Sequence, residues 1–286
     1  MNNNITAMVF TFNEERRLPF VYENLKDFCQ IIVFDGGSSD GTEDYCKAKN
    51  IKFLLRKEDD NDRINGLIWS YDNSPTDYTL HVYCHYFYPK ELLDTFSEIA
   101  NKGELSAVYH DMVVYRYGKV VQKTIVRRIS SACSFYKKSI IDFKNTKIHD
   151  ELAIQFDEDS MVRLDARDEL SLHRFIDEDC QSFTVKTIDY AAREASQKFI
   201  AGYTIGFFGL LFKPLWRFSY SYFLRTGTVV RGTPGLIYAL MNLIYDYHVC
   251  IIIWELCHDL DLKGVIRENE LTRLKLIRGM HDSEKK

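Results

Sequence analysis

Short apolar segments typical of strands alternate with helical segments over the first hundred residues of the chain. The strands are expected at residues 5–12, 31–35, 51–55 and 78–84, and the helices at 14–28, 41–50, around 63–72 and from Pro89 onward. Strands this apolar need cover on both faces, and parallel strands need a helix between them. The alternation therefore predicts an α/β fold with a Rossmann-like, mostly parallel sheet flanked by helices.

Residues 106–126 alternate apolar and polar positions around Tyr117–Lys119 and predict a β-hairpin.

Composition limits the number of domains and the kind of partner. The chain has 286 residues, 46% of them hydrophobic, enough for one large domain and an appendage. A net charge of −4 and a pI near 6.1 argue against nucleic acid as a partner, because such binders present a strongly basic face. The seven cysteines include no C-x-x-C pair, so neither a zinc site nor a disulfide framework is indicated. The first ten residues lack the features of a signal peptide, and we expect a cytoplasmic protein.

Polar residues stand at the ends of three expected strands, where a packed core would not select them. They are "TFNEER" at 11–16, "FDGGSSDGT" at 34–42 and "YCH" at 83–85. Ligands on parallel sheets bind at the carboxyl ends of strands. The glycines after Asp35 fit a turn, and Ser39 or Asp40 can cap the next helix. The Asp35 carboxylate itself stands where it can accept hydrogen bonds from a ribose hydroxyl or a base N–H.

The pair "TFNEERRL" and "QIIVFDGGSSDGT", at this spacing, resembles the opening of the family 2 glycosyltransferases of GT-A fold, particularly the lipopolysaccharide-core enzymes similar to WaaE. The resemblance implies that Thr11, Phe12, Glu14 and Asp35 surround the nucleobase and ribose of a sugar nucleotide. It also matches Arg63 to a basic residue near the nucleotide. The alternative for Arg63 is a solvated helix end.

A second match lies in "SFYKKSIIDFKNTKIHDEL" at 134–152, which resembles a family segment carrying the general base. Asp150 falls at the position of that base, with Glu151 as the next candidate and His149 beside them. A sugar hydroxyl that attacks the anomeric carbon must lose a proton, and a positioned carboxylate can take it. Direct displacement of this kind inverts the anomeric centre. The alternative is an exposed helix start at which Asp150 is an N-terminal charge.

Two histidines complete the candidate residues. His173 in "ELSLHRF" matches a family histidine, whose role is either contact with the donor diphosphate or packing. His85 belongs to "YCH", which replaces the family's metal-binding Asp-x-Asp with Tyr83, Cys84 and His85. Three interpretations follow: His85 alone holds a manganese or magnesium ion with help from donor phosphates, cationic or hydrogen-bonding groups replace the metal, or activity is lost.

The C-terminal part differs in character from the rest. From Lys198 to Tyr245 the chain has five basic residues and no acidic one. The uncharged run at 199–212 is shorter than the roughly 20 residues of a membrane-spanning helix, and a later run includes Asp246 and His248. Aromatic and basic residues around Trp216 favour helices lying in the headgroup zone of an anionic membrane. The alternative is a helical subdomain packed on the sheet or on a second subunit.

Together these features predict a catalytic domain over 1–198 and a helical, membrane-associating region over 199–286. The resemblance implies an inverting glycosyltransferase with a nucleotide-sugar donor, a UDP-sugar favoured. The expected acceptor is a hydroxyl of a lipid-linked glycan or lipopolysaccharide-type molecule at the cytoplasmic face of the inner or plasma membrane. A catalytically silent sugar-nucleotide-binding or scaffold protein of a glycan assembly complex is the alternative.

Overall fold

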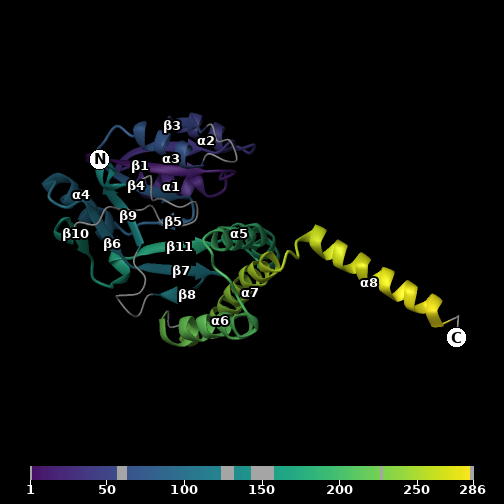
Figure 1. Cartoon of the computed structure of the whole chain (residues 1–286). Coiled ribbons are helices and arrows are strands. Elements are labelled where there is room, and N and C mark those ends of the chain that lie inside the picture. The colour runs from purple at the N-terminus through teal and green to yellow at the C-terminus, as the bar shows by residue number, and fades with distance from the viewer. Residues whose placement is uncertain (1, 57–62, 124–131, 143–157, 226–227, 284–286) are drawn as a thin grey trace. The chain divides into compact units, whose positions relative to one another are not determined.

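The computed structural model describes residues 2–56, 63–123, 132–142, 158–225 and 228–283 (Figure 1). The chain divides into two compact units. The first comprises Met1–Asp177 and Arg225–Gly235 and holds every described strand, and the second comprises Glu178–Leu224 and Leu236–Lys286 and is helical. The predicted boundary after residue 198 falls within helix α5 (Cys180–Ile200), the first helix of the second unit.

Seven strands form the main sheet, in the order β10-β6-β9-β4-β1-β2-β3. Strands β3, β2, β1 and β4 are parallel neighbours, whereas β9 runs antiparallel to both β4 and β6. The sheet confirms the predicted α/β class with a mostly parallel sheet. Its strands are β1 (Asn2–Thr11), β2 (Cys29–Asp35), β3 (Lys52–Leu55), β4 (Tyr78–Tyr83), β6 (Ala107–His110), β9 (Ala132–Lys137) and β10 (Met161–Arg163).

Both faces of the main sheet are buried, as expected for parallel strands. Alternate residues of β1 enter two different core clusters, with Ala7 and Val9 on one face and Met8 and Phe10 on the other. The first cluster includes residues of α1 and α4, and the second includes Tyr71 of α3. The helices of this unit are α1 (Leu18–Leu25), α2 (Thr42–Ala48), α3 (Arg63–Asp72) and α4 (Lys90–Lys102).

Helix α1 begins four residues later than the sequence pattern predicts. The backbone carbonyl of Glu14 accepts hydrogen bonds from the N–H groups of Arg17 (2.9 Å) and Leu18 (2.8 Å), which makes a turn before the helix. Pro19 then occupies the first turn, where its missing N–H leaves no bond unmade. The "TFNEER" segment is therefore a loop at the end of β1 rather than the start of a helix.

The carboxyl ends of the central strands meet in register. Thr11 pairs with Asp35 across β1 and β2, and Phe10 pairs with Tyr83 across β1 and β4. Leu55 at the end of β3 pairs with Asp35 from the other side. The three polar strand ends singled out in the sequence consequently lie along one edge of the sheet.

A second, four-stranded sheet has the order β5-β11-β7-β8, with β5 (Tyr86–Phe87), β7 (Met112–Arg116), β8 (Lys119–Lys123) and β11 (Leu172–Ile176). Strands β7 and β8 form the predicted hairpin, whose turn places Tyr117 and Gly118 at positive φ angles of 53° and 68°. The predicted hairpin was too long at its start, since residues 107–110 form β6 of the main sheet instead.

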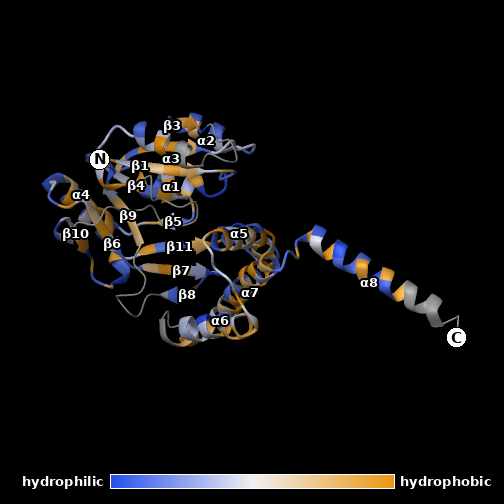
Figure 2. Ribbon diagram, viewed as in Figure 1, coloured by the Kyte–Doolittle hydropathy of each residue, from blue (hydrophilic) through white to orange (hydrophobic). Residues whose placement is uncertain are grey.

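The helical unit contains α5, α6 (Phe207–Ser219), most of α7 (Gly232–Cys257) and α8 (Leu262–Ser283). A small core joins Ala191 and Ala195 of α5 to Val249 and Ile253 of α7. Figure 2 shows α7 apolar along most of its length. Among the described residues, the helical segment Thr228–Cys257 is the one whose length and composition would allow it to cross a membrane.

Candidate functional site

Asp35 is a buried carboxylate at the end of β2, and its own chain supplies its hydrogen bonds. Oδ1 accepts from the backbone N–H groups of Gly37 (2.8 Å) and Ser38 (2.7 Å). Oδ2 accepts from the hydroxyls of Thr11 (2.7 Å) and Ser38 (2.5 Å). A carboxylate has about four acceptor positions, and here four donors fill them. Asp35 therefore fixes the shape of the loop that follows it.

The same loop is joined to the loop after β1 by further hydrogen bonds. The N–H of Asn13 donates to Ser38 Oγ (2.7 Å), and Asn13 Oδ1 accepts from the N–H of Ser39 (2.8 Å). The N–H of Glu14 donates to Thr42 Oγ1 (2.9 Å). Asn13 has a φ of 56°, a left-handed conformation that asparagine tolerates better than most residues. The two motifs that carry the sequence resemblance thus form one hydrogen-bonded structure.

Phe12 and Glu14 have different surroundings in the β1 loop. The Phe12 side chain is 61% exposed. The Glu14 carboxylate forms two hydrogen bonds with the Arg17 guanidinium, both of 2.6 Å. Burial opposes the charge on Arg17, but the bonds to Glu14 outweigh it and raise the pKa of Arg17. Phe12 is open to a ligand, whereas Glu14 already holds a cation of its own chain.

Arg56, which belongs to none of the sequence motifs, lies beside these loops. A Cβ placed on Gly36 would stand 3.0 Å from Arg56 Nη2 and 3.7 Å from Phe12 Cδ2, so the glycine admits both side chains. The Arg56 guanidinium is 5.4 Å from the centre of the Phe10 ring. The sequence does contain a signal for Arg56, because it is a basic residue directly after the last residue of β3.

The three side chains of "YCH" have different surroundings, since Cys84 enters the core whereas Tyr83 and His85 stack on each other. The rings of Tyr83 and His85 stack with centroids 5.6 Å apart and an interplanar angle of 2°, and Tyr83 is 41% exposed. Cys84 is buried in the core, and burial raises the pKa of its thiol. The stretch therefore offers a hard cation no ligand beyond the His85 imidazole.

These side chains do not fit a magnesium or manganese site, because such ions require several oxygen ligands. No group of three or more His, Cys, Asp or Glu side chains suited to a metal occurs among the residues that the structure describes. His85 as a metal ligand stays a prediction without support from its neighbours.

His81 is a second residue that the sequence analysis missed. Its Nδ1 lies 2.9 Å from the Tyr71 hydroxyl, which is hydrogen-bonded to the Tyr136 hydroxyl. Its ring stacks on Phe10 at 4.4 Å. Burial, together with the Arg56 charge, lowers the pKa of His81 to about 3, so the imidazole is neutral. A histidine inside the apolar strand sequence "YTLHVYC" was the available signal.

His173 lies on β11 in the second sheet. Its Nε2–H donates to the carbonyl of Asp168 (3.1 Å), and its Nδ1 accepts from the Tyr115 hydroxyl (3.0 Å). This tautomer follows from the partners, since a carbonyl can only accept. Both ring nitrogens are thus engaged within the chain, which supports the packing interpretation; a role toward the donor stays a prediction.

The remaining candidates can be placed only in part. Arg63 is the first residue of α3. His149, Asp150 and Glu151 lie outside the described residues, so the general-base assignment stays a prediction.

The two buried histidines generate a prediction about acid stability. Burial lowers the pKa of His110 to about 4, as it lowers that of His81 to about 3, whereas an unfolded histidine titrates near 6.5. Between pH 6.5 and 4 the unfolded chain binds more protons than the folded one. As the pH is lowered through this range, the free energy of unfolding should therefore decrease, by up to about 1.4 kcal/mol per pH unit for each histidine.

Urea denaturation at a series of pH values checks this. His81→Gln should lower the slope by the contribution of about one proton. Phe20→Ser, which changes an exposed residue that does not titrate, should leave the slope unchanged. An unchanged slope in His81→Gln would show that His81 is protonated in the folded protein.

Comparison with known proteins identifies the family. The model of the family described as "Glycosyl transferase family 2" matches residues 6–159. No curated protein matches the chain. Among solved structures, Staphylococcus aureus TarS 1–349 in complex with UDP-GlcNAc has 14% identity and a TM-score of 0.45, with 67% of this chain and 66% of that chain covered.

Glucosyl-3-phosphoglycerate synthase from Mycobacterium tuberculosis, in complex with phosphoglyceric acid, has 16% identity and a TM-score of 0.33. The match covers 40% of this chain and 45% of that chain, and the chain spans less than half the length of the first solved structures that it matches. The family match, in contrast, extends over more than half of the 286 residues. This chain therefore belongs to glycosyl transferase family 2.

Proposed function

We propose that the chain transfers a sugar from a nucleotide-sugar donor to an acceptor hydroxyl, with the donor bound at the carboxyl ends of β1, β2 and β4. The observation that carries this proposal is the hydrogen-bonded pair of loops around Asp35, inside the segment that matches the family. Ligands of parallel sheets bind at this edge. A site already shaped before the donor arrives loses less entropy on binding.

Each predicted donor residue receives a role in this proposal. Asp35 and Thr11 hold the loops, and the Phe12 and Tyr83 rings offer stacking surfaces for a nucleobase. Glu14 and Arg63 are proposed to lie near the ribose and phosphates. A UDP-sugar is the donor class to test first; UDP-GlcNAc is the ligand of the TarS complex.

A panel of UDP-, GDP- and CDP-sugars tests the donor class by thermal shift. One class should raise the melting temperature, because a ligand at about 100 times its Kd adds about 2.7 kcal/mol of stability. Manganese or magnesium should change the shift only mildly, since His85 is a lone ligand. No shift with any donor would contradict the proposed function.

Chelation separates the metal interpretations in the same assay. If EDTA removes the shift, an ion is held by carboxylates elsewhere, and Asp60 and Asp62, outside the described residues, are the first to replace. His85→Asp should increase the response to manganese by restoring an oxygen ligand.

Because the described side chains do not fit a metal site, we propose that other groups of the chain balance the charge of the departing nucleoside diphosphate. The candidates at this sheet edge are the Arg56 guanidinium and the His85 imidazole in its protonated form. A positioned cation in a partly dry site stabilises developing negative charge. On the acceptor side, we propose that Asp150 takes the proton of the attacking hydroxyl and that the displacement inverts the anomeric centre.

Asp150→Asn should slow transfer by about two to four orders of magnitude, the usual effect of removing a general base. Release of nucleoside diphosphate in the presence of a glycolipid extract measures transfer, and thermal shift measures donor binding, which should be unchanged. Glu151→Gln is the matched control. Normal turnover by Asp150→Asn together with a slow Glu151→Gln would move the role of base to Glu151.

The alternative class, a silent sugar-nucleotide-binding or scaffold protein, is favoured by one observation, the absence of carboxylates at residues 83–85. It predicts that the donor binds to the wild-type protein without any turnover or slow hydrolysis.

Helix α6 supports a proposal about location. Its exposed side chains include an apolar series at helical spacing, with Trp216 71% exposed. The series comprises Phe207, Phe208, Leu211, Phe212, Leu215 and Trp216. Exposed aromatic rings along one helix favour the headgroup zone of a membrane. We propose peripheral binding at the cytoplasmic face of the inner or plasma membrane, which would bring a lipid-linked glycan or lipopolysaccharide-type acceptor to the enzyme.

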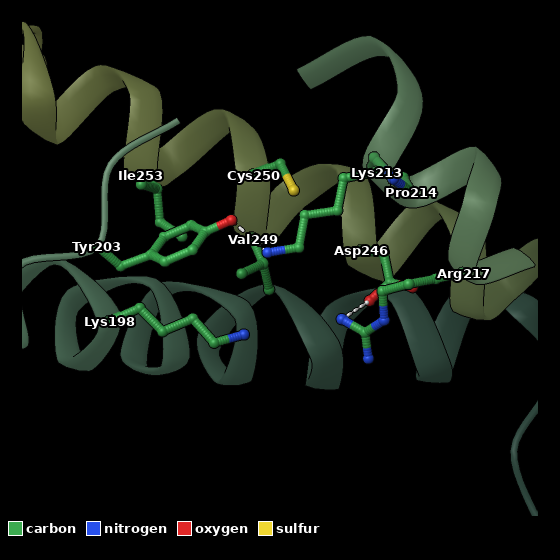
Figure 3. A pocket seen from close by; sticks show the side chains of 9 residues that line it. All are labelled: Lys198, Tyr203, Lys213, Pro214, Arg217, Asp246, Val249, Cys250 and Ile253. Carbon is green, nitrogen blue, oxygen red and sulfur yellow. Dashed lines mark hydrogen bonds and ion pairs between the residues drawn. The ribbon is translucent and has the colours of Figure 1, made fainter. Parts of the chain in front are cut away.

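The basic residues of this helix turn toward a pocket of the helical unit (Figure 3). Arg217 forms an ion pair with Asp246 of α7 (2.8 Å), and Lys213 bonds the Tyr203 hydroxyl. Asp246 in the apolar α7 is thus paired within the protein, which favours packing of α7 over exposure of this position to lipid.

Vesicle flotation tests the membrane proposal. The full chain should float with vesicles that contain phosphatidylglycerol, and high salt should weaken this binding. Phe212→Ser with Trp216→Ser should reduce binding by about tenfold or more, because two apolar rings no longer enter the interface. Phe20→Ser, at an exposed position on α1, is the control. Failure of the wild-type protein to float would assign α6 to a protein interface.

A further inference from the structure

Four aromatic side chains form a continuous series across three strands of the second sheet. Phe87 of β5 lies 6.1 Å from His173 of β11, between ring centroids. His173 stacks on Tyr115 of β7 at 5.5 Å, and Tyr115 stacks on Phe175 of β11 at 4.7 Å with an interplanar angle of 14°. We call Phe87, Tyr115, His173 and Phe175 the aromatic ladder.

The strand register puts the ladder on one face of the sheet. His173 pairs with Phe87, and Phe175 pairs with Tyr115. Side chains alternate along a strand, so Leu172, which enters the core, lies on the opposite face of β11. On the ladder face, Phe87 is 43% exposed and Phe175 is 41% exposed. Large rings exposed in a group, rather than singly, mark a binding surface.

Two contacts connect the ladder to the proposed donor site. The backbone N–H of Phe175 donates to the carbonyl of His85 (2.8 Å), the last residue of "YCH". Arg16, in the loop after β1, pairs with Asp177 just beyond β11 (3.0 Å). The end of β11 that carries Phe175 therefore adjoins both donor-site segments, and a molecule on the ladder would extend toward the donor.

The chemistry of the ladder favours an uncharged ring as its occupant. Phe87, Tyr115 and Phe175 carry no charge, and both ring nitrogens of His173 are already engaged within the chain. The ladder thus lacks the cations that a phosphate or an anionic headgroup requires. A pyranose offers C–H groups that pack on aromatic faces and hydroxyls that bond to a rim such as the Tyr115 oxygen.

We propose that the aromatic ladder is the acceptor subsite and that it takes a neutral pyranose ring of the acceptor glycan by stacking on Phe175. This inference rests on the proposed function, because an acceptor subsite requires a sugar donor beside it. The occupant is a sugar of the acceptor rather than a lipid chain.

Saturation-transfer NMR on the full chain tests the subsite with methyl α- and β-glycosides of glucose, galactose and N-acetylglucosamine as probes. At least one glycoside should bind the wild-type protein through its C–H protons. Phe175→Ala should weaken that binding about threefold to tenfold, the size of one ring-stacking contact. Phe175→Trp should retain it. Phe20→Ala, which removes an exposed phenylalanine of α1, is the matched control.

Donor binding by thermal shift, measured on the same variants, separates the two claims and shows that each variant is folded. Loss of glycoside binding in Phe175→Ala with normal donor binding supports the subsite. Normal donor binding with equal glycoside binding in wild-type and Phe175→Ala proteins, or with no glycoside bound at all, overturns the subsite and leaves the proposed function standing. Absence of donor binding in the wild-type protein overturns the proposed function and the subsite with it.

Discussion

The buried Asp35 carboxylate is the constraint on which the proposed donor site depends. A charge taken out of water costs several kcal/mol unless hydrogen bonds replace its hydration. The Asp35 carboxylate accepts such bonds from Thr11, Gly37 and Ser38. Those bonds draw the loop after β2 onto the end of β1. The loop in turn holds Asn13 and Glu14 of the neighbouring motif. The Asp35 carboxylate, a residue of the family motif, thus holds the two loops at this edge of the sheet in one arrangement.

Hydrophobic periodicity was enough to predict the main sheet, because strands covered on both faces have few alternatives. It predicted α1 too early, because the turn made by the Glu14 carbonyl and the bond from the Glu14 N–H to the Thr42 side chain cannot be read from periodicity. The motifs also predicted which strand ends form the site. They could not predict that Asp35 is saturated by its own loop, or that Arg56 and His81 lie beside it. Those facts depend on which residues meet across strands, and a single sequence does not contain that information.

The loss of carboxylates at "YCH" changes the chemistry expected of this family member rather than its fold. Cys84 fills the core, while Tyr83 and His85 stack on each other and supply no carboxylate ligand. The same strand end leads into β5 and, through the His85 carbonyl, to β11. The proposed donor site and the proposed acceptor subsite would therefore adjoin each other at this short segment. Aromatic rings would stand there in place of the metal-binding carboxylates of the family.

The most direct test of the account is the affinity of the best nucleotide sugar for Asp35→Asn, measured by calorimetry beside Asp44→Asn, an exposed carboxylate of α2. Circular dichroism confirms that both variants are folded. The account predicts at least about tenfold weaker donor binding for Asp35→Asn, because hydrogen bonds to a charged group contribute about 1.5–3 kcal/mol each. It predicts wild-type affinity for Asp44→Asn. Wild-type affinity in a folded Asp35→Asn protein would show that the donor does not use the loops that Asp35 holds.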